Sequence, residues 1–169
     1  MSKMKEIRIE KMTLNVGAGK DQNRLKKGVM LLKHLTGIEP VKTVTRKRIP
    51  SWGLRPGLPI GCKLTLRKNI SELLKKFLAA KENNLSEENF DDSGNVSFGI
   101  HEYIDIPGVK YDPEIGITGF QISVTLARQG YRVKKRRLLK SKIGKNHIIT
   151  RGDAIGYFKK NYGVEIEEE

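Results

Sequence analysis

Apolar and polar residues alternate in several segments of the chain. Met12, Leu14 and Val16, for example, alternate with polar neighbours. A period of two places successive side chains on opposite faces of a β-sheet, so each such segment is predicted to be a strand with one buried and one polar face. The strands predicted in this way cover residues 7–16, 62–67, 96–100 and 120–126, and residues 41–45 are predicted to form a short strand.

Three other segments repeat apolar residues with the helical period. The first is predicted to begin after Asp21, which caps it, and to end at Gly37. The second begins after Asn69, with Glu72 in the capping-box position. The third begins after Thr150. Each is expected to be an amphipathic helix that packs its apolar face on the strands.

The order of these elements predicts the fold class. Strands and helices are mixed without an internal repeat or a linker, so we expect a single α+β domain over residues 1–169, with a mainly antiparallel sheet covered on one face by helices. The acidic stretch at 82–92 is predicted to be a surface segment. Three further segments have a biased composition: a basic loop at 46–59, a basic extension at 128–151 and an acidic tail at 165–169.

Positive charge narrows the choice of partner. The 169 residues include 33 Lys and Arg against 19 Asp and Glu, which gives a formal net charge of +14. Such an excess attracts nucleic-acid phosphates, because neutralising them releases condensed counterions. No apolar run is long enough to cross a membrane, and the first residues show no apolar signal segment. We therefore expect a cytoplasmic RNA-binding protein with no membrane partner.

No motif supports catalysis or a cofactor. The glycine turn at 17–19 invites a nucleotide-binding interpretation, but a Rossmann fingerprint needs glycine where Gln22 stands, and a phosphate-binding loop needs Ser or Thr where Asp21 stands. Cys62 is the only cysteine, and the three histidines are scattered, so no metal site is predicted. We found no nucleophile beside a base, and expect no enzyme activity and no cofactor.

The first concentration of positive charge lies between Pro40 and Ile70. This stretch contains no acidic residue. Solvated surfaces usually mix both signs, so contact with RNA is favoured over a merely solvated loop. Trp52, the only tryptophan, lies in the basic loop, where it either stacks on a base or ribose or anchors the loop to the core.

The second concentration lies between Ile115 and Gly152, again without an acidic residue. A tract of this kind repels itself when free, so we expect it to become ordered against phosphate. The residues predicted to pin it to the domain are Tyr131, Leu138, Leu139 and Ile143.

Five motifs in a fixed order resemble a known family. They are KMTLNVGAG at 11–19, PVKTVTRK at 40–47, LPIGCKLTLR at 58–67, GNVSFGI at 94–100 and DPEIGI at 112–117. Together they are similar to the universal fifth protein of the large ribosomal subunit, which binds 5S rRNA in the central protuberance. The tract from KRR at 135–137 to IGKNH at 143–147, and the short segment before the first strand, resemble the archaeal form.

The resemblance implies a structural role in the ribosome. The expected partners are 5S rRNA, large-subunit rRNA, peptidyl-site tRNA, the other 5S-binding ribosomal protein and a small-subunit head protein at an inter-subunit bridge. Asn15 and Thr65 match family positions for 5S contact, and the loop from Ile49 to Pro59 matches the element that approaches tRNA. One departure is Ile38, where bacterial members carry glutamine, so a hydrogen bond at that point is not expected.

The resemblance and the charge pattern together give three sets of site residues. The predicted rRNA-binding residues are Asn15, Gly17, Thr43, Thr45, Arg46, Lys47, Lys63, Thr65 and Arg67. The predicted tRNA-proximal residues are Arg48, Trp52, Arg55 and Gly57. The residues predicted to lie on RNA phosphates are Lys134, Lys135, Arg136, Arg137 and Lys145. The alternatives are a non-ribosomal RNA chaperone, a subunit of an RNA-modifying enzyme, or a DNA-compacting protein.

Overall fold

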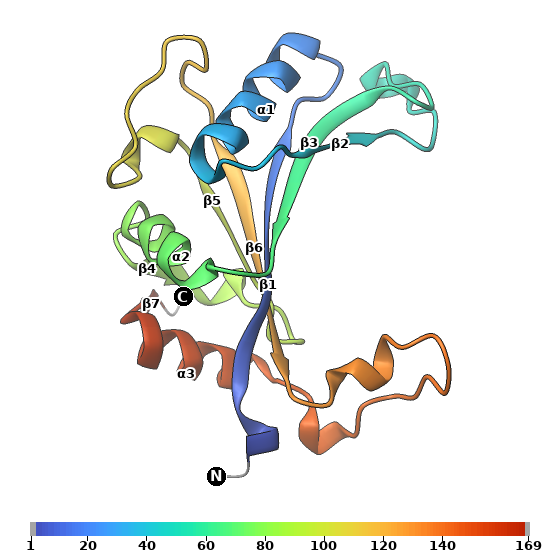
Figure 1. Ribbon diagram of the computed structural model, residues 1–169, viewed down its shortest axis with the longest axis vertical. Helices are drawn as coiled ribbons and strands as arrows, with labels where there is room; N and C mark the ends of the chain where they lie inside the picture. The colour runs from blue at the N-terminus through green and yellow to red at the C-terminus, as the bar shows by residue number, and fades with distance from the viewer. Residues whose placement is uncertain (1–2, 168–169) are drawn as a thin grey trace. The chain divides into compact units, whose positions relative to one another are not determined.

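The computed structural model describes residues 3–167 and contains the expected mixture of helices and strands (Figure 1). The helices are α1 (Gln22–Thr36), α2 (Ile70–Ala79) and α3 (Arg151–Tyr162). The strands are β1 (Ile7–Gly17), β2 (Val41–Val44), β3 (Pro59–Leu66), β4 (Asn84–Ser86), β5 (Val96–Ile100), β6 (Phe120–Arg128) and β7 (Glu165–Glu167). Five of them form an antiparallel sheet in the order β2-β3-β1-β6-β5, which confirms the predicted α+β class.

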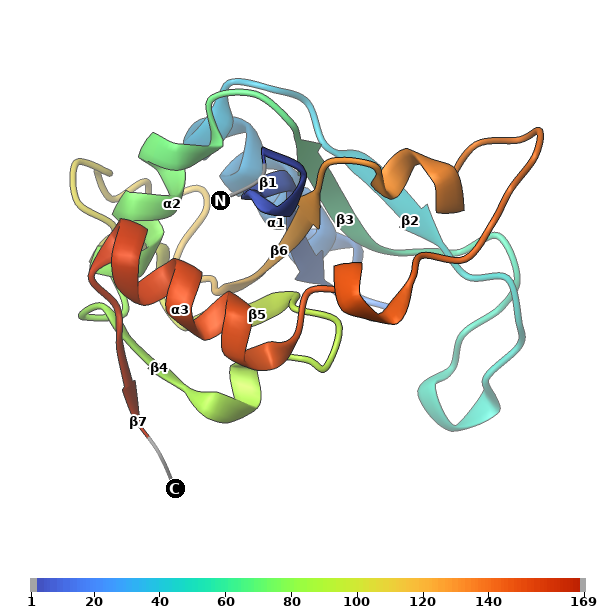
Figure 2. The ribbon, with the colours of Figure 1, turned by 90° about the horizontal axis from the view of Figure 1, so that it is seen from below.

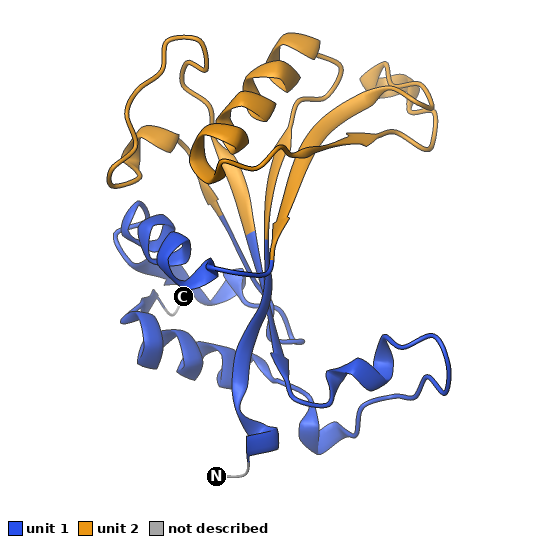
Figure 3. Ribbon diagram, in the orientation of Figure 1, with its two compact units in different colours: residues 1–12, 67–98, 123–169 blue, residues 13–66, 99–122 orange. Residues whose placement is uncertain are grey.

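The chain divides into two compact units (Figure 3). Unit 2 comprises residues 13–66 and 99–122, and unit 1 comprises the remaining segments, including 67–98 and the chain from 123 onward. Strands β1, β5 and β6 each contribute residues to both units. The expectation of a single domain over residues 1–169 stays a prediction.

Helix α1 packs directly on the strands of unit 2. A Cβ atom at Gly28 would lie 2.8 Å from Cγ1 of Val16 and 3.3 Å from Sγ of Cys62, so only glycine allows this close approach of helix and sheet. Cys62 is fully buried, and its burial raises the pKa of the thiol to about 11. The thiol therefore stays protonated at neutral pH and acts as a small apolar side chain.

Both ends of α1 confirm the sequence prediction. The Asp21 carboxylate accepts hydrogen bonds from the backbone N–H groups of Asn23, at 2.8 Å, and Arg24, at 3.3 Å. Gly37 ends the helix in the left-handed conformation, and its N–H donates to the Lys33 carbonyl. These bonds satisfy backbone groups that a helix leaves unpaired at its ends.

The core of unit 1 is built around α2 and α3. Helix α2 buries one face, formed by Ile70, Leu74, Phe77 and Leu78. In α3, Phe158 is fully buried, and its ring makes an edge-to-face contact with Phe90 at a centroid distance of 5.9 Å. The amphipathic pattern of α2 thus predicted its buried face, whereas the buried residues of α3 are Ala154 and Phe158.

The start of α2 differs from the prediction, whereas the start of α3 contains a capping box that was not predicted. Asn69 has a φ of 53° and its side chain makes no capping bond, so the expected capping box with Glu72 is wrong. A capping side chain reaches the first amides from an extended backbone, which the left-handed conformation of Asn69 does not provide. At α3, Thr150 and Asp153 bond reciprocally and form a capping box.

The acidic segments are more ordered than their composition predicted. Strand β4 lies within the acidic stretch at 82–92, and Leu85 and Phe90 from this stretch are buried, so its assignment as a surface segment is wrong for these two residues. The acidic tail forms β7, which follows α3 (Figure 2) and pairs in parallel with β4 through Leu85 and Ile166. Glu168 and Glu169 of the predicted tail lie outside the described residues.

Candidate RNA interface

The strands of unit 2 present a polar face opposite the apolar face on which α1 packs. On β3, Lys63 and Thr65 are exposed, whereas the residues that alternate with them are buried. Asn15 of β1 is likewise flanked by buried residues, and its side-chain amide donates to the Gln121 side chain of β6 at 3.2 Å. We call the set Asn15, Thr43, Lys63, Thr65 and Gln121 the open strand face.

The pairing of β2 with β3 decides which cations join the open strand face. Val41 pairs with Lys63, Lys42 with Cys62, and Thr43 with Gly61. Directly opposed residues share a face of a sheet, so Thr43 lies on the same face as Lys63, and Lys42 lies on the face of buried Cys62.

Gly61 sits at a crowded point of this face. A Cβ atom there would lie 2.6 Å from the Val16 carbonyl oxygen and 3.2 Å from Oγ1 of Thr43. A larger residue would therefore force the strands apart where Thr43 is presented. Glycine in a strand interior commonly marks such a close backbone approach.

A shallow open depression borders the open strand face within unit 2. Its volume is about 420 Å³, and Asn15, Gly17, Arg24, His101 and Gln121 are among its lining residues. None of the lining residues is acidic. Amide groups together with Arg24 and His101 offer hydrogen bonds to phosphate and ribose oxygens of an RNA.

The glycine turn between β1 and α1 holds the strands together rather than offering free amides. The N–H groups of Ala18 and Gly19 both donate to the Ile60 carbonyl, at 2.9 and 3.0 Å. At the adjacent helix start, the Asp21 carboxylate occupies the amides that would otherwise attract a phosphate. These bonds agree with the sequence argument against a small-nucleotide site.

The basic loop is folded at its tip. Ile49 and Leu54 form an antiparallel bridge, and residues 50–52 make a short 3-10 turn. Leu54 is 2% exposed, whereas Trp52 is 68% exposed, so Leu54 rather than Trp52 buries itself in unit 2. The exposed ring does not anchor the loop to the core, so stacking on a base or ribose remains as the predicted role of Trp52.

The predicted residues of this loop divide into two kinds. Thr45 is 7% exposed and its hydroxyl donates to the Leu58 carbonyl at 3.0 Å, so this side chain closes the loop. The exposed cations are Arg46, Lys47, Arg48 and Arg55. Across residues 3–167, none of these four forms an ion pair, which leaves all four charges available to an anionic partner.

The basic extension belongs to unit 1 and is anchored by Tyr131 and Arg128. The Tyr131 hydroxyl donates to the His147 carbonyl at 3.1 Å and accepts from the Ile149 N–H at 2.9 Å. The Arg128 guanidinium, nearly buried, donates to Asp153 at 3.0 Å. Burial alone would raise the pKa of Asp153, but its bonds with Thr150 and the charge of Arg128 hold that pKa below the ordinary value.

Other expectations for the extension need correction. Leu138 and Leu139 are 72% and 84% exposed, so they do not pin the tract as predicted, whereas Tyr131 is buried and Ile143 half-buried. Lys135 forms an ion pair with Glu10 of β1, an acidic partner that the local sequence did not reveal. Arg136 donates to the Leu139 carbonyl at 2.7 Å. The side chains of Lys145 and Arg137 are exposed, as is that of Arg67, which follows β3 in unit 1.

In the part of the chain from 3 to 167, no group of three or more His, Cys, Asp or Glu side chains is placed to hold a metal ion. Across the same residues, no helix is long and apolar enough to cross a membrane.

Sequence reasoning missed three residues of the unit 2 site: Gln121, Arg24 and His101. The alternation in 120–126 showed that Gln121 is on a polar face, but nothing local shows that this strand lies beside Asn15, 106 positions away. Strand pairing over such a separation is a tertiary property.

Two consecutive segments of the chain match models of one protein family. Residues 2–55 match the family model described as "Ribosomal protein L5". Residues 59–146 match the model that describes the C-terminus of the same ribosomal protein family. Together these segments cover most of the chain.

Curated relatives are similar over nearly the whole length. The large ribosomal subunit protein uL5 of Sulfolobus acidocaldarius is 46% identical over 98% of this chain and 93% of its own length. The protein of the same name from Nanoarchaeum equitans is 47% identical over 96% of this chain and 97% of its own. That of Methanococcus maripaludis strain C5 is 45% identical over 98% and 94%.

Proposed function

Because the chain belongs to the uL5 family of large-subunit ribosomal proteins, we propose that its open strand face binds 5S rRNA and helps attach it in the central protuberance. The family consists of structural ribosomal proteins rather than enzymes, so the chain is a constituent of the large subunit, as its sequence predicted. That the bound RNA is 5S rRNA, and which proteins lie beside it, are proposals.

One observation carries the proposal: polar side chains from four strands share one uncovered face. Asn15, Thr43 and Thr65 offer hydrogen bonds, and Lys63 offers a charge that no described acidic residue pairs with. The sheet behind them is fixed by the packing of α1 at Gly28. A rigid polar surface with one cation suits recognition of a folded RNA by shape, with phosphate contacts setting its position.

The test removes the amide of Asn15 and the hydroxyl of Thr65, the two residues that match family positions for 5S contact. Asn15→Ala combined with Thr65→Ala removes two hydrogen bonds of about 0.5–1.5 kcal/mol each, so 5S rRNA affinity should fall roughly tenfold. Filter binding at moderate salt measures it, with tRNA and duplex DNA as competitors. Ser97→Ala with Ser123→Ala is the matched control, because these paired strand hydroxyls belong to unit 1.

The result also separates the alternatives. Unchanged 5S affinity in the double variant would remove the open strand face from the site. Equal competition by tRNA and duplex DNA, with affinity collapsing as salt rises, would indicate a generic polycation of the DNA-compacting kind. Preference for 5S rRNA that survives raised salt supports the ribosomal proposal.

We assign the tip of the basic loop to peptidyl-site tRNA. The support is the exposure of Trp52 together with Arg48 and Arg55, on a tip held in shape by the Ile49–Leu54 bridge. An exposed aromatic ring between cations can stack on a base or ribose while the cations hold phosphates.

Crosslinking tests this assignment in ribosomes. With a photoreactive phenylalanine in place of Trp52, we expect a crosslink to tRNA when the peptidyl site is filled and none to tRNA when it is empty. A crosslink only to rRNA in both states would contradict the assignment. Large subunits without the photoreactive residue serve as the control.

Two protein neighbours and large-subunit rRNA complete the proposal. The edge strand β2 exposes Val41 and Val44, at 64% and 55%, which suits a protein partner such as the small-subunit head protein at the bridge. The basic extension, with exposed Arg137 and Lys145, suits phosphates of large-subunit rRNA. The other 5S-binding protein is expected beside the same RNA.

A further inference from the structure

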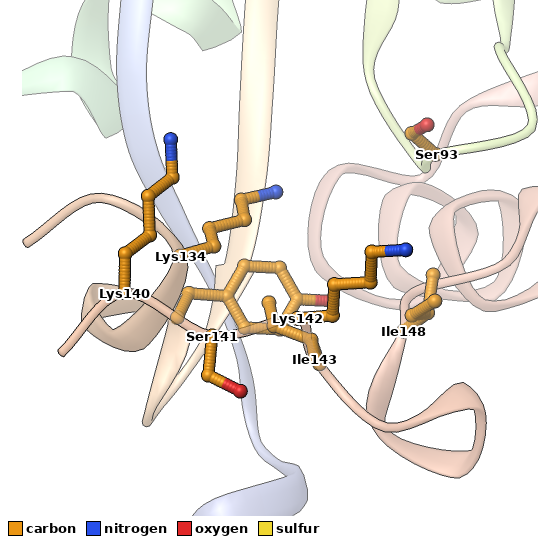
Figure 4. A pocket seen from close by; sticks show the side chains of 8 residues that line it. Ser93, Lys134, Lys140, Ser141, Lys142, Ile143 and Ile148 are labelled. Atoms are coloured by element: carbon orange, nitrogen blue, oxygen red, sulfur yellow. The ribbon is translucent and has the colours of Figure 1, made fainter.

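A pocket in unit 1 lies among the residues of the basic extension. Its volume is about 580 Å³, within the range of small-ligand sites. Its walls combine apolar and basic side chains: Ser93, Tyr131, Lys134, Lys140, Ser141, Lys142, Ile143 and Ile148. Figure 4 shows the three lysines together with Ile143 and Ile148, and Ser93 on a separate segment.

One wall of this pocket is fixed. The Tyr131 ring is 8% exposed and is held by the two hydrogen bonds of its hydroxyl to His147 and Ile149. The Lys134 ammonium lies 4.9 Å from the centroid of this ring, an attraction between a cation and an aromatic face. The buried Tyr131 ring, whose hydroxyl makes two hydrogen bonds, thus holds the Lys134 ammonium at the pocket in the absence of a ligand.

The chemistry of the walls selects the kind of ligand. Lys134, Lys140 and Lys142 have no ion-pair partner among residues 3–167, and no acidic residue lines the pocket. Three uncompensated ammonium groups attract several anionic oxygens. Half-buried Ile143 and 40% exposed Ile148 add apolar surface to the same pocket, on which a flat uncharged group buries area.

We propose that this pocket takes a single unstacked nucleotide of a bound RNA, with its base against Ile143 and Ile148 and its flanking phosphates on the three lysines. RNA is recognised chiefly at unpaired nucleotides whose bases can be splayed into such sites. The Ser93 hydroxyl at the rim supplies a hydrogen bond for a base edge. The inference rests on the proposed RNA-binding function but uses residues other than those of the open strand face.

The test compares three RNA hairpins that differ at one position: one with a single-nucleotide bulge, one with the same bulge lacking its base, and one fully paired. The full-length protein should bind the bulged hairpin roughly tenfold more tightly than the abasic one, about 1.4 kcal/mol, because the base buries apolar area on Ile143 and Ile148. A 2-aminopurine at the bulge should change its fluorescence on binding. Equal affinity for bulged and abasic hairpins would overturn the proposal.

Variants assign the effect to the pocket. Ile143→Ser should abolish the preference for the base while leaving abasic binding unchanged, and thermal unfolding checks that this half-exposed position tolerates the change. Lys142→Gln should weaken binding of bulged and abasic hairpins alike. Lys145→Gln, in the same tract but outside the pocket, is the matched charge control and should weaken binding of both hairpins less than Lys142→Gln does. Retention of that preference in Ile143→Ser would overturn the proposal.

The outcome is separable from that of the 5S proposal. Ile143→Ser should keep wild-type affinity for 5S rRNA if the open strand face alone carries that affinity. Loss of 5S binding in Asn15→Ala with Thr65→Ala, together with an intact preference for the bulged hairpin, would place the two functions on different residues. If the protein prefers the bulged hairpin but the 5S binding test fails, the nucleotide pocket is supported and only the assignment of 5S rRNA is rejected.

Discussion

Lys63→Glu is expected to lower the affinity for 5S rRNA roughly 10- to 100-fold at moderate salt, about 1.4–2.7 kcal/mol. The lysine is the cation of the open strand face, exposed between buried Cys62 and Leu64 on a central strand. Its replacement removes one phosphate contact and adds a like charge against the RNA backbone. Filter binding across a salt series should also show a salt slope smaller by about one.

Lys42→Glu is the matched control for this prediction. Lys42 is exposed on the neighbouring strand β2, but it pairs with Cys62 and therefore lies on the opposite face of the sheet from Lys63. The two variants have the same net charge, so a general electrostatic effect would weaken both equally. We expect Lys42→Glu to retain affinity within about threefold. Equal losses in the two variants would contradict a site confined to the open strand face.

Phe158→Ala is expected to lower the free energy of unfolding by about 3–5 kcal/mol, the usual range for removing a buried phenylalanine ring. Phe158 is fully buried in unit 1, where its ring contacts Phe90, Tyr157 and Tyr162 at centroid distances of 5.9, 5.9 and 5.6 Å. The truncated side chain would leave a cavity among these rings. Urea unfolding followed by circular dichroism measures the change.

Trp52→Ala is the control for the loss of an aromatic ring. Trp52 is 68% exposed in the basic loop, so its removal should change the free energy of unfolding by no more than about 0.5 kcal/mol. A small effect at Phe158 would mean that α3 contributes little to the unfolding transition that is measured. Separate transitions for different probes would show that units 1 and 2 unfold independently, against the predicted single domain.

Local patterns were sufficient for most elements of the fold. The alternation around Met12, Leu14 and Val16 identified the buried face of β1, and all three are nearly or fully buried. Asp21 and Gly37 bound α1 as predicted, because capping depends on residues within a few positions of each other. Asn69 failed as a cap because its backbone conformation, rather than its residue type, decides whether the side chain reaches the amides.

Segments judged by composition alone were less well predicted. The acidic tail was identified by composition alone, which did not predict that Glu165–Glu167 form a strand beside β4. Leu138 and Leu139 were expected to pack and are exposed, whereas the hydroxyl of Tyr131 joins the two ends of the extension through its bond with Ile149. Composition reports the average environment of a segment and does not reveal which partner a side chain meets.

By itself the sequence determined the mixed fold class, the family, the polar faces of β1, β3 and β6 and the two basic tracts, because periodicity, motifs and charge are encoded within short stretches of chain. Only the tertiary structure decided that Asn15 lies beside Gln121, that Lys63 and Lys42 point to opposite faces, and that Lys135 meets Glu10. These pairings join residues from different strands and segments. They depend on strand order and register, which packing of the whole chain selects.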